Sequence, residues 1–169
     1  LLQMKEKALA ASDSSLDSAS RTALNEDFKS LRDQIGKAVT NATFNGINMI
    51  KSGGQTIAAL ADADGSSKLT VGAQDLSLGG ANVTVGSTDS IGTQTLAQNM
   101  IATVATSIGN VSTALSKLGT GAKSLNSHLS FVGKLQDSID AGIGNLVDAD
   151  LAKESARLTS LQTKQQLGV

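Results

Sequence analysis

Two glycines and two aspartates stand close together in the stretch IDAGIGNLVDAD, residues 139–150. Gly142 and Gly144 could cradle a phosphate, and Asp148 and Asp150 could supply oxygens to a metal ion. A dinucleotide loop needs a preceding strand and a third glycine, which is missing here. Two carboxylates supply too few oxygens for a calcium site. We therefore interpret the stretch as a helix joint, where the glycines weaken one helix and Asp148 or Asp150 caps the next.

The remaining candidates for chemistry are a single histidine and a second pair of glycines. His128 is the only histidine, and the chain has no cysteine. No Ser or Asp lies at a recognised motif spacing from it, so a catalytic role is not indicated. Gly119-Thr120-Gly121 begins like a phosphate loop but lacks the G-K-[ST] sequence that would follow. We expect no catalytic residue, metal, cofactor or small-molecule substrate, and hence a protein that is not an enzyme.

The composition is poor in residues that hold ligands. The 169 residues include no Trp, Tyr, Pro or Cys and three Phe, and the net charge is −1. Large aromatic side chains are typical of small-molecule pockets and interface hot spots. A nearly neutral chain has no general electrostatic attraction to nucleic acid or an anionic membrane. No apolar run approaches the ~18 residues of a membrane-spanning helix. The length suits a single domain with a hydrophobic core.

Aliphatic residues recur at alternating intervals of three and four in the second half of the chain. This is the heptad pattern of helices that pack side by side, and only Gln136 interrupts it. At ~1.5 Å per residue one such helix would span roughly 70 Å, so we expect a rod-shaped molecule. The large residues of this predicted core seam are Ile101, Val104, Ile108, Val111, Leu115, Leu118, Leu125, Leu129, Val132, Ile139, Ile143 and Leu146.

The first 46 residues predict two shorter helices. Residues 1–11 are rich in helix formers and end at a Ser/Asp turn. The second helix ends at the turn signal formed by Phe44, Asn45 and Gly46. Its own predicted core seam consists of Leu24, Phe28, Leu31 and Ile35.

Residues 47–92 differ from the rest because glycine and polar residues separate short aliphatic runs. Such runs predict short antiparallel strands, and a sheet this small must lean on helices to be stable. The predicted strands are TIAAL (56–60), KLTV (68–71), QDLSL (74–78) and NVTV (82–85).

The fold class predicted from these patterns is mainly α. We expect an elongated antiparallel bundle or coiled coil of long helices with a small antiparallel β-hairpin region. Within one domain we distinguish an N-terminal helical part (1–46), a small β-region with a variable segment (47–92), a long C-terminal helix (93–147) and the start of a terminal helix (148–169).

Two stretches carry a more specific pattern, LRDQIGKAVTNATFNG (31–46) and GNLVDADLAKESARLTSLQTKQQLGV (144–169). Together they resemble bacterial flagellin, and HLSFVGKLQDSIDAGIGNLVDADLAKE (128–154) is especially similar to the alphaproteobacterial type. The resemblance covers nearly the whole chain. It implies an extracellular structural subunit of the flagellar filament, which polymerises with other flagellin subunits through long-helix packing and serves motility. An export chaperone is a further partner that the resemblance allows.

The resemblance also implies a longer chain, because the family has a helix upstream of LLQMKEKALAAS and continues beyond QQLGV. We therefore expect a truncated fragment of the core that lacks both terminal segments and does not form filaments by itself. Two alternatives stay open, a hook–filament junction protein of the same superfamily and a flagellin-like surface adhesin or polysaccharide-binding module. The adhesin would need exposed aromatic side chains for stacking, and the chain has few aromatic residues.

Overall fold

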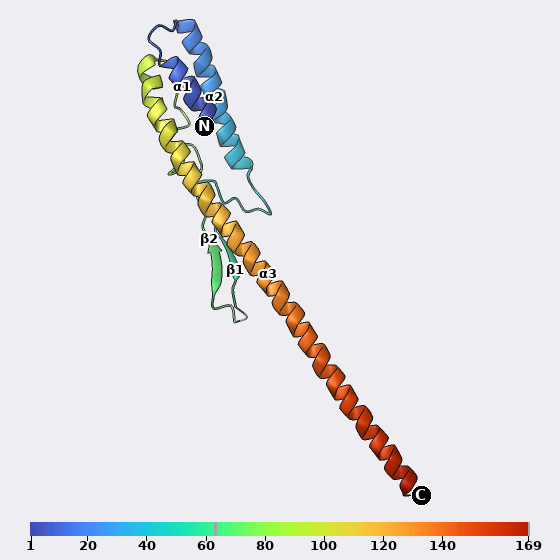
Figure 1. The fold of residues 1–169 in the computed structure, drawn as a ribbon. Helices are drawn as coiled ribbons and strands as arrows, with labels where there is room; N and C mark the ends of the chain where they lie inside the picture. Colours follow the sequence, from blue (N-terminus) through green and yellow to red (C-terminus); the bar gives the residue numbers. More distant parts are fainter. Residues whose placement is uncertain (63, 169) are drawn as a thin grey trace. The chain divides into compact units, whose positions relative to one another are not determined.

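The computed structural model describes residues 1–62 and 64–168. In these residues the elements are α1 (Leu2–Ala11), α2 (Ser18–Asn41), β1 (Ile57–Leu60), β2 (Lys68–Val71) and α3 (Gln94–Leu167) (Figure 1). Their contacts form two compact units, which we call the N-terminal unit (Leu1–Ser124) and the C-terminal unit (Leu125–Val169). The predicted mainly α fold with a long C-terminal helix and a small antiparallel hairpin is confirmed, and the rod shape stays a prediction.

A short turn joins α1 to α2 and is held by side chains of the second helix. Asp17 caps α2, because its carboxylate accepts the Ser20 backbone N–H at 2.8 Å. Arg21 reaches back to the end of α1 and donates to the carbonyl oxygens of Ala11 at 3.0 Å and Asp13 at 2.8 Å. The last carbonyl groups of a helix have no N–H partner within that helix. Arg21 therefore supplies hydrogen-bond donors to carbonyl groups at the end of α1 and just after it.

The hydrophobic core of the N-terminal unit draws on all three helices and on the irregular segment before α3. Burying a large aliphatic or aromatic side chain contributes ~1.5–3 kcal/mol gross, so this cluster is the main source of the unit's stability. Its buried members are Met4, Ala8, Ala11, Phe28, Val39, Leu76, Val83, Val85, Ile91, Ala97, Met100, Val104 and Ala114.

The β-region holds one antiparallel hairpin, paired from Ile57 with Val71 to Leu60 with Lys68. The expected strands at 74–78 and 82–85 are wrong, since that stretch is irregular apart from a bridge between Leu78 and Val83. Some of its backbone groups bond to residues 49 and 50 instead of to a neighbouring strand. Leu76 N–H, for example, donates to the Ile50 carbonyl at 2.8 Å. The apolar alternation that suggested strands is used to pack side chains against helices.

The helix α3 is continuous over 74 residues. The helix break predicted at Gly142, Gly144, Asp148 and Asp150 is therefore wrong. All four residues lie inside α3, and neither aspartate caps a new helix. Each glycine weakens a helix by only ~1 kcal/mol. Helix propagation is cooperative, and the stretch has no proline to remove a hydrogen bond.

Candidate functional site

The residues considered for chemistry do not come together in the structure. Gly142 and Gly144 face open space, with no heavy atom within 4 Å of an added Cβ. Asp148 and Asp150 are exposed on α3, and His128 is half-buried on the same helix. Among the described residues no three His, Cys, Asp or Glu side chains are grouped so as to hold a metal ion.

The second glycine pair lies inside α3 and has a packing role. A Cβ on Gly121 would come within 2.5 Å of Val71 Cγ1, whereas one on Gly119 would meet nothing within 4 Å. Gly121 therefore lies at a close approach between β2 and α3, and the absence of a side chain makes that approach feasible. The resemblance of this motif to a phosphate loop has no structural basis, because the segment is helical.

None of the helices in residues 1–62 and 64–168 combines the length and the apolar character of a membrane span.

The buried stripe of α3 in the N-terminal unit is rotated relative to the predicted seam. Ile101 and Ile108 are only partly buried and Leu115 is 57% exposed. The residues that directly precede them in the sequence, Met100, Ser107 and Ala114, are buried instead. Three of the five buried residues, Ala97, Ser107 and Ala114, have small side chains. Small side chains let a helix approach its neighbours, and a search for large aliphatic residues overlooks them. The buried residues of α3 are Ala97, Met100, Val104, Ser107 and Ala114.

The remaining predicted seam residues fall into three groups. Phe28 and Val104 are fully buried. Leu24, Leu31, Ile35 and Val111 are partly buried and pack against the core, and Leu118 and Leu125 are half-buried. Leu129, Val132, Ile139, Ile143 and Leu146 are exposed.

Polar side chains fasten the irregular segment before α3 to the helices. Asn25 accepts the Ile91 N–H at 2.7 Å, and Arg32 donates to the Asp89 carbonyl at 2.8 Å. The Ser107 hydroxyl accepts the Thr84 N–H at 2.9 Å. These contacts link residues far apart in the sequence, so no local pattern announces them. The sequence offers one signal for such contacts, which is a polar residue on the helical face that is predicted to be buried. Asn25 and Ser107 are examples, because a buried polar side chain needs a hydrogen-bond partner.

The exposed surface of the N-terminal unit has grooves of contrasting character. One lies between α1 and α2 and includes an ion pair between Lys7 and Asp27 at 2.7 Å. The hydrogen bond to Asp27 raises the pKa of Lys7 above its ordinary value. A second groove is uncharged in its side chains, and we call it the apolar groove. It is lined by Leu1, Leu2, Gln3, Ile108, Val111, Ser112 and Leu115.

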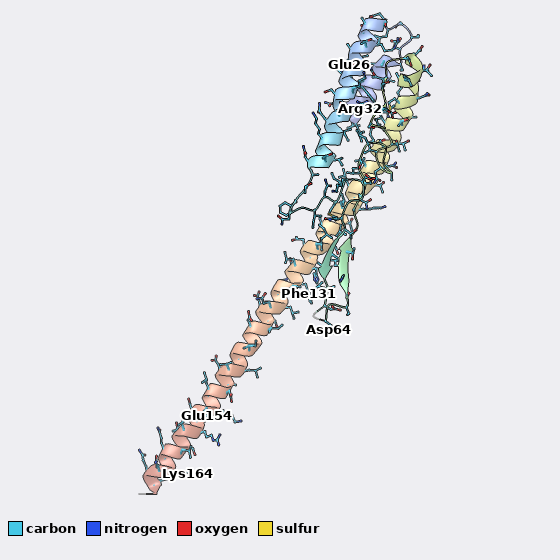
Figure 2. All side chains as sticks on the ribbon, turned by 180° about the vertical axis from the view of Figure 1, so that it is seen from behind. Glu26, Arg32, Asp64, Phe131, Glu154 and Lys164 are labelled. Atoms are coloured by element: carbon cyan, nitrogen blue, oxygen red, sulfur yellow. The ribbon has the colours of Figure 1, made fainter. Side chains whose placement is uncertain are left out.

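The C-terminal unit displays its apolar residues on the surface. Leu129 is 70% exposed and Leu146 is 73% exposed. Figure 2 shows the side chains of Glu154 and Lys164 standing out from the same helix. We call the following residues of this unit the exposed stripe: Leu129, Val132, Ile139, Ile143 and Leu146. A heptad seam that is open to solvent is typical of a surface that packs against a further helix.

Comparison with known proteins shows the family of the chain. The family model for the bacterial flagellin N-terminal helical region matches residues 1–56, and that for the C-terminal helical region matches residues 101–169. Flagellin FljO of Caulobacter vibrioides is 56% identical over 99% of this chain and 60% of its own length. A flagellin of Brucella melitensis is 34% identical over 98% of this chain and 61% of its own. The chain thus spans about 60% of the length of these curated relatives.

A solved structure gives an independent likeness of the fold. The crystal structure of Bacillus cereus flagellin aligns with a TM-score of 0.59 over 75% of this chain and 70% of that one, at 22% sequence identity. At this identity the likeness supports the fold alone. The two matched family regions together take in α1, α2 and most of α3. With flagellins of alphaproteobacteria similar to it over nearly its whole length, the chain belongs to the bacterial flagellin family.

Proposed function

We propose that this chain is part of a structural subunit of the bacterial flagellar filament, an extracellular polymer that acts as the propeller of motility. The observation that carries the proposal is the exposed stripe of α3, in a chain that belongs to the flagellin family. A large aliphatic side chain gains ~1.5–3 kcal/mol gross when it is buried. Several such residues on one helical face favour association with another helix over exposure to water.

The mechanism of the proposed function is packing between helices. Residues of the exposed stripe recur at intervals of three, four and seven, which places them along one side of α3. The partners are other flagellin subunits, in a homopolymer or a mixed polymer. No catalytic group, cofactor or nucleic acid takes part in this role. An export chaperone stays a prediction of the family resemblance.

A second part of the proposal concerns the glycines at 142 and 144. They lie inside α3 with open space around them, so they lower helix stability locally without serving a close contact. We infer that this weakened turn lets subunit contacts shift when the filament supercoils. Replacing both with alanine is expected to alter filament handedness or swimming, and unchanged motility would contradict this part.

Electron microscopy of the full-length protein tests the main proposal. Negative staining is expected to show uniform long tubes, which neither an adhesin nor a hook–filament junction protein would form. Ile139→Asp, which puts a charge on the exposed stripe, is expected to abolish tubes because burying an unpaired charge is very unfavourable. Ser138→Asp adds the same charge to an adjacent exposed position and is expected to leave tubes intact. Normal assembly of the Ile139→Asp variant would contradict the packing mechanism.

A further inference from the structure

An asparagine–glycine pair forms the exposed turn that follows α2. Phe44 and Ile47 exchange two backbone hydrogen bonds, each 2.9 Å long, around Asn45 and Gly46. Asn45 has φ of 49° and Gly46 has φ of 78°, which are the positive values that a type I′ turn requires at its two central residues. Asn45 is the only asparagine of the sequence that is followed by glycine. We call residues 43–47 the Asn45 turn.

An asparagine that precedes a glycine can lose its side-chain amide without an enzyme. The backbone nitrogen of the glycine gives its proton to hydroxide or a buffer base and attacks the asparagine Cγ. Glycine favours this attack because it has no Cβ to crowd the nitrogen. A C–N bond forms, the side-chain amide leaves as ammonia with a proton from water, and a five-membered succinimide ring remains. Water then opens the ring at either carbonyl, one ring C–N bond breaks, and the product is aspartate or isoaspartate.

Both reacting groups of this pair are accessible in the folded chain. Asn45 and Gly46 are exposed, and a Cβ added to Gly46 would meet nothing within 4 Å. Within residues 1–62 and 64–168, no hydrogen bond engages the Gly46 N–H or the Asn45 side chain. The attacking nitrogen and the leaving amide are therefore in contact with water, and no neighbouring group has to be displaced before they meet.

Closing the ring requires a brief opening of the Asn45 turn, and little in the structure opposes it. Two backbone hydrogen bonds between Phe44 and Ile47 close the turn, and residues 43–47 are all exposed. Segments with exposed hydrogen bonds and few buried contacts open at a low cost in free energy. Just beyond the turn, Asn48 is 2% exposed and its amide nitrogen donates to the Val39 carbonyl at 2.7 Å. The opening can therefore stay confined to the turn.

The other asparagines of the described chain lack this combination of features. Asn48 and Asn82 use their amide nitrogens to donate to backbone carbonyls at 2.7 Å. Asn41 is exposed, but the N–H of the following Ala42 donates to the Val39 carbonyl at 3.4 Å. The remaining asparagines lie inside helices, where the next N–H donates to a carbonyl one turn earlier. These are Asn25, Asn99, Asn110, Asn126 and Asn145.

We propose that Asn45 is a site of spontaneous deamidation in the folded protein, which converts it to aspartate and isoaspartate. The product carries a carboxylate beside Phe44, whose side chain is 80% exposed. Residues 38–50 contain no charged side chain, so the new charge changes the character of this surface. Isoaspartate also adds one carbon atom to the backbone, which no longer fits the type I′ geometry. This reactivity belongs to one turn of the chain and does not depend on assembly into a filament.

Heavy-oxygen water tests the proposal on the folded, full-length monomer. During incubation in mildly alkaline buffer made with this water, opening of the ring puts a heavy oxygen atom into the product carboxylate. The label marks conversion that took place before digestion in ordinary water. Trypsin cleaves after Lys37 and Lys51, so one peptide contains Asn41, Asn45 and Asn48. Fragmentation mass spectrometry of this peptide compares the three residues directly.

Labelled acid is expected to form at Asn45 at least about tenfold faster than at Asn41, which corresponds to about 1.4 kcal/mol in activation free energy. Asn41 is the matched control, because it is also exposed but precedes alanine. Asn45→Gln is expected to remove the label at this position, since its longer side chain would have to close a less favourable six-membered ring. Thermal unfolding verifies that this variant is folded. Label at Asn45 that forms no faster than at Asn41 would overturn the proposal, and so would label that appears at Asn45 only after the protein is unfolded in urea.

Discussion

The N-terminal and C-terminal units have similar heptad patterns, but the apolar residues are buried in the first unit and exposed in the second. In the N-terminal unit Phe28 is fully buried, and a cluster of apolar residues surrounds it. In the C-terminal unit the same spacing leaves Leu146 73% exposed. The periodicity thus predicts a helix with an apolar face in both units, but it does not say what covers that face. In one unit the cover belongs to the same compact unit, and in the other we propose that it comes from further flagellin segments.

The largest effect expected from this comparison is on monomer stability. Phe28→Ala should lower the free energy of unfolding of the N-terminal unit by ~3–5 kcal/mol, because it removes a buried ring and leaves a cavity. Leu146→Ala in the C-terminal unit should change monomer stability by less than ~0.5 kcal/mol, as an exposed substitution does. Urea unfolding of dilute, monomeric protein measures both values.

In assembly, the variant with the smaller effect on monomer stability, Leu146→Ala, should be the one that matters. Leu146→Ala is expected to weaken tube formation although it leaves the monomer unchanged, since Leu146 belongs to the exposed stripe. An equal loss of monomer stability in the two variants would show that the stripe is already covered within one chain, and the contrast between the units would be wrong.

The next effect concerns two glycines within two residues of each other. Gly121→Ala should destabilise the N-terminal unit by ~1–3 kcal/mol through overpacking, partly offset by better helix propensity. The cause is Val71, whose Cγ1 lies 2.5 Å from the added Cβ position. Gly119→Ala, with nothing within 4 Å, should stabilise the helix by up to ~1 kcal/mol. Thermal unfolding compares them.

The assignment of the clash to one side chain has its own test. Val71→Ala removes both methyl groups that approach Gly121. Adding it to Gly121→Ala should therefore cost less than the sum of the two single changes. Strict additivity of the two changes would mean that β2 does not rest on α3 at this point.

A smaller and local effect is expected in the C-terminal unit. Gly142→Ala with Gly144→Ala should strengthen the helix by up to ~2 kcal/mol, since each glycine costs ~1 kcal/mol. Amide hydrogen exchange of residues 138–148 should slow accordingly, because local opening becomes rarer. Unfolding of the N-terminal unit should not change. A stabilised N-terminal unit in this variant would contradict the division into two units.

Much of the helical framework was predictable from sequence because it depends on local patterns. The helices at 2–11 and 18–41 and the hairpin of Ile57–Leu60 with Lys68–Val71 follow from runs and turns within each segment. The long C-terminal helix follows from its heptads. The helix joint predicted at Gly142 and Gly144 was wrong. Two glycines do not interrupt a helix when the residues around them favour helix and helix propagation is cooperative.

Other features were not predictable, because they depend on distant parts of the chain. The buried stripe of α3 relies on Ala97, Ser107 and Ala114, whose small size matters only where another segment approaches. The Asn25 bond to the Ile91 backbone spans 66 positions. For the exposed stripe, the sequence predicted the spacing of the apolar residues, and the structure showed that they are exposed.

Acid should act on the N-terminal unit through the turn between α1 and α2, with the smallest effect of this series. Hydrogen bonds from the Ser20 hydroxyl and backbone hold the pKa of Asp17 below its ordinary value of 3.8. The unfolded chain therefore binds a proton more readily than the folded one in this range, and stability rises with pH. The contribution of the Asp17 carboxylate is fully present well above pH 3.8 and is lost as the pH falls through the lower, folded-state pKa.

Asp17→Ser isolates this titration, because serine also accepts a hydrogen bond as an N-cap but does not ionise in this range. Urea unfolding between pH 7 and about pH 2.5 should show a shallower loss of stability for Asp17→Ser than for the wild type. Asp13 keeps its own lowered pKa in both proteins, owing to hydrogen bonds from the Ser15 backbone and hydroxyl, so part of the acid sensitivity should persist. Parallel curves for the two proteins would mean that the Asp17 cap contributes equally in its charged and neutral forms, and that the acid response of the N-terminal unit originates elsewhere.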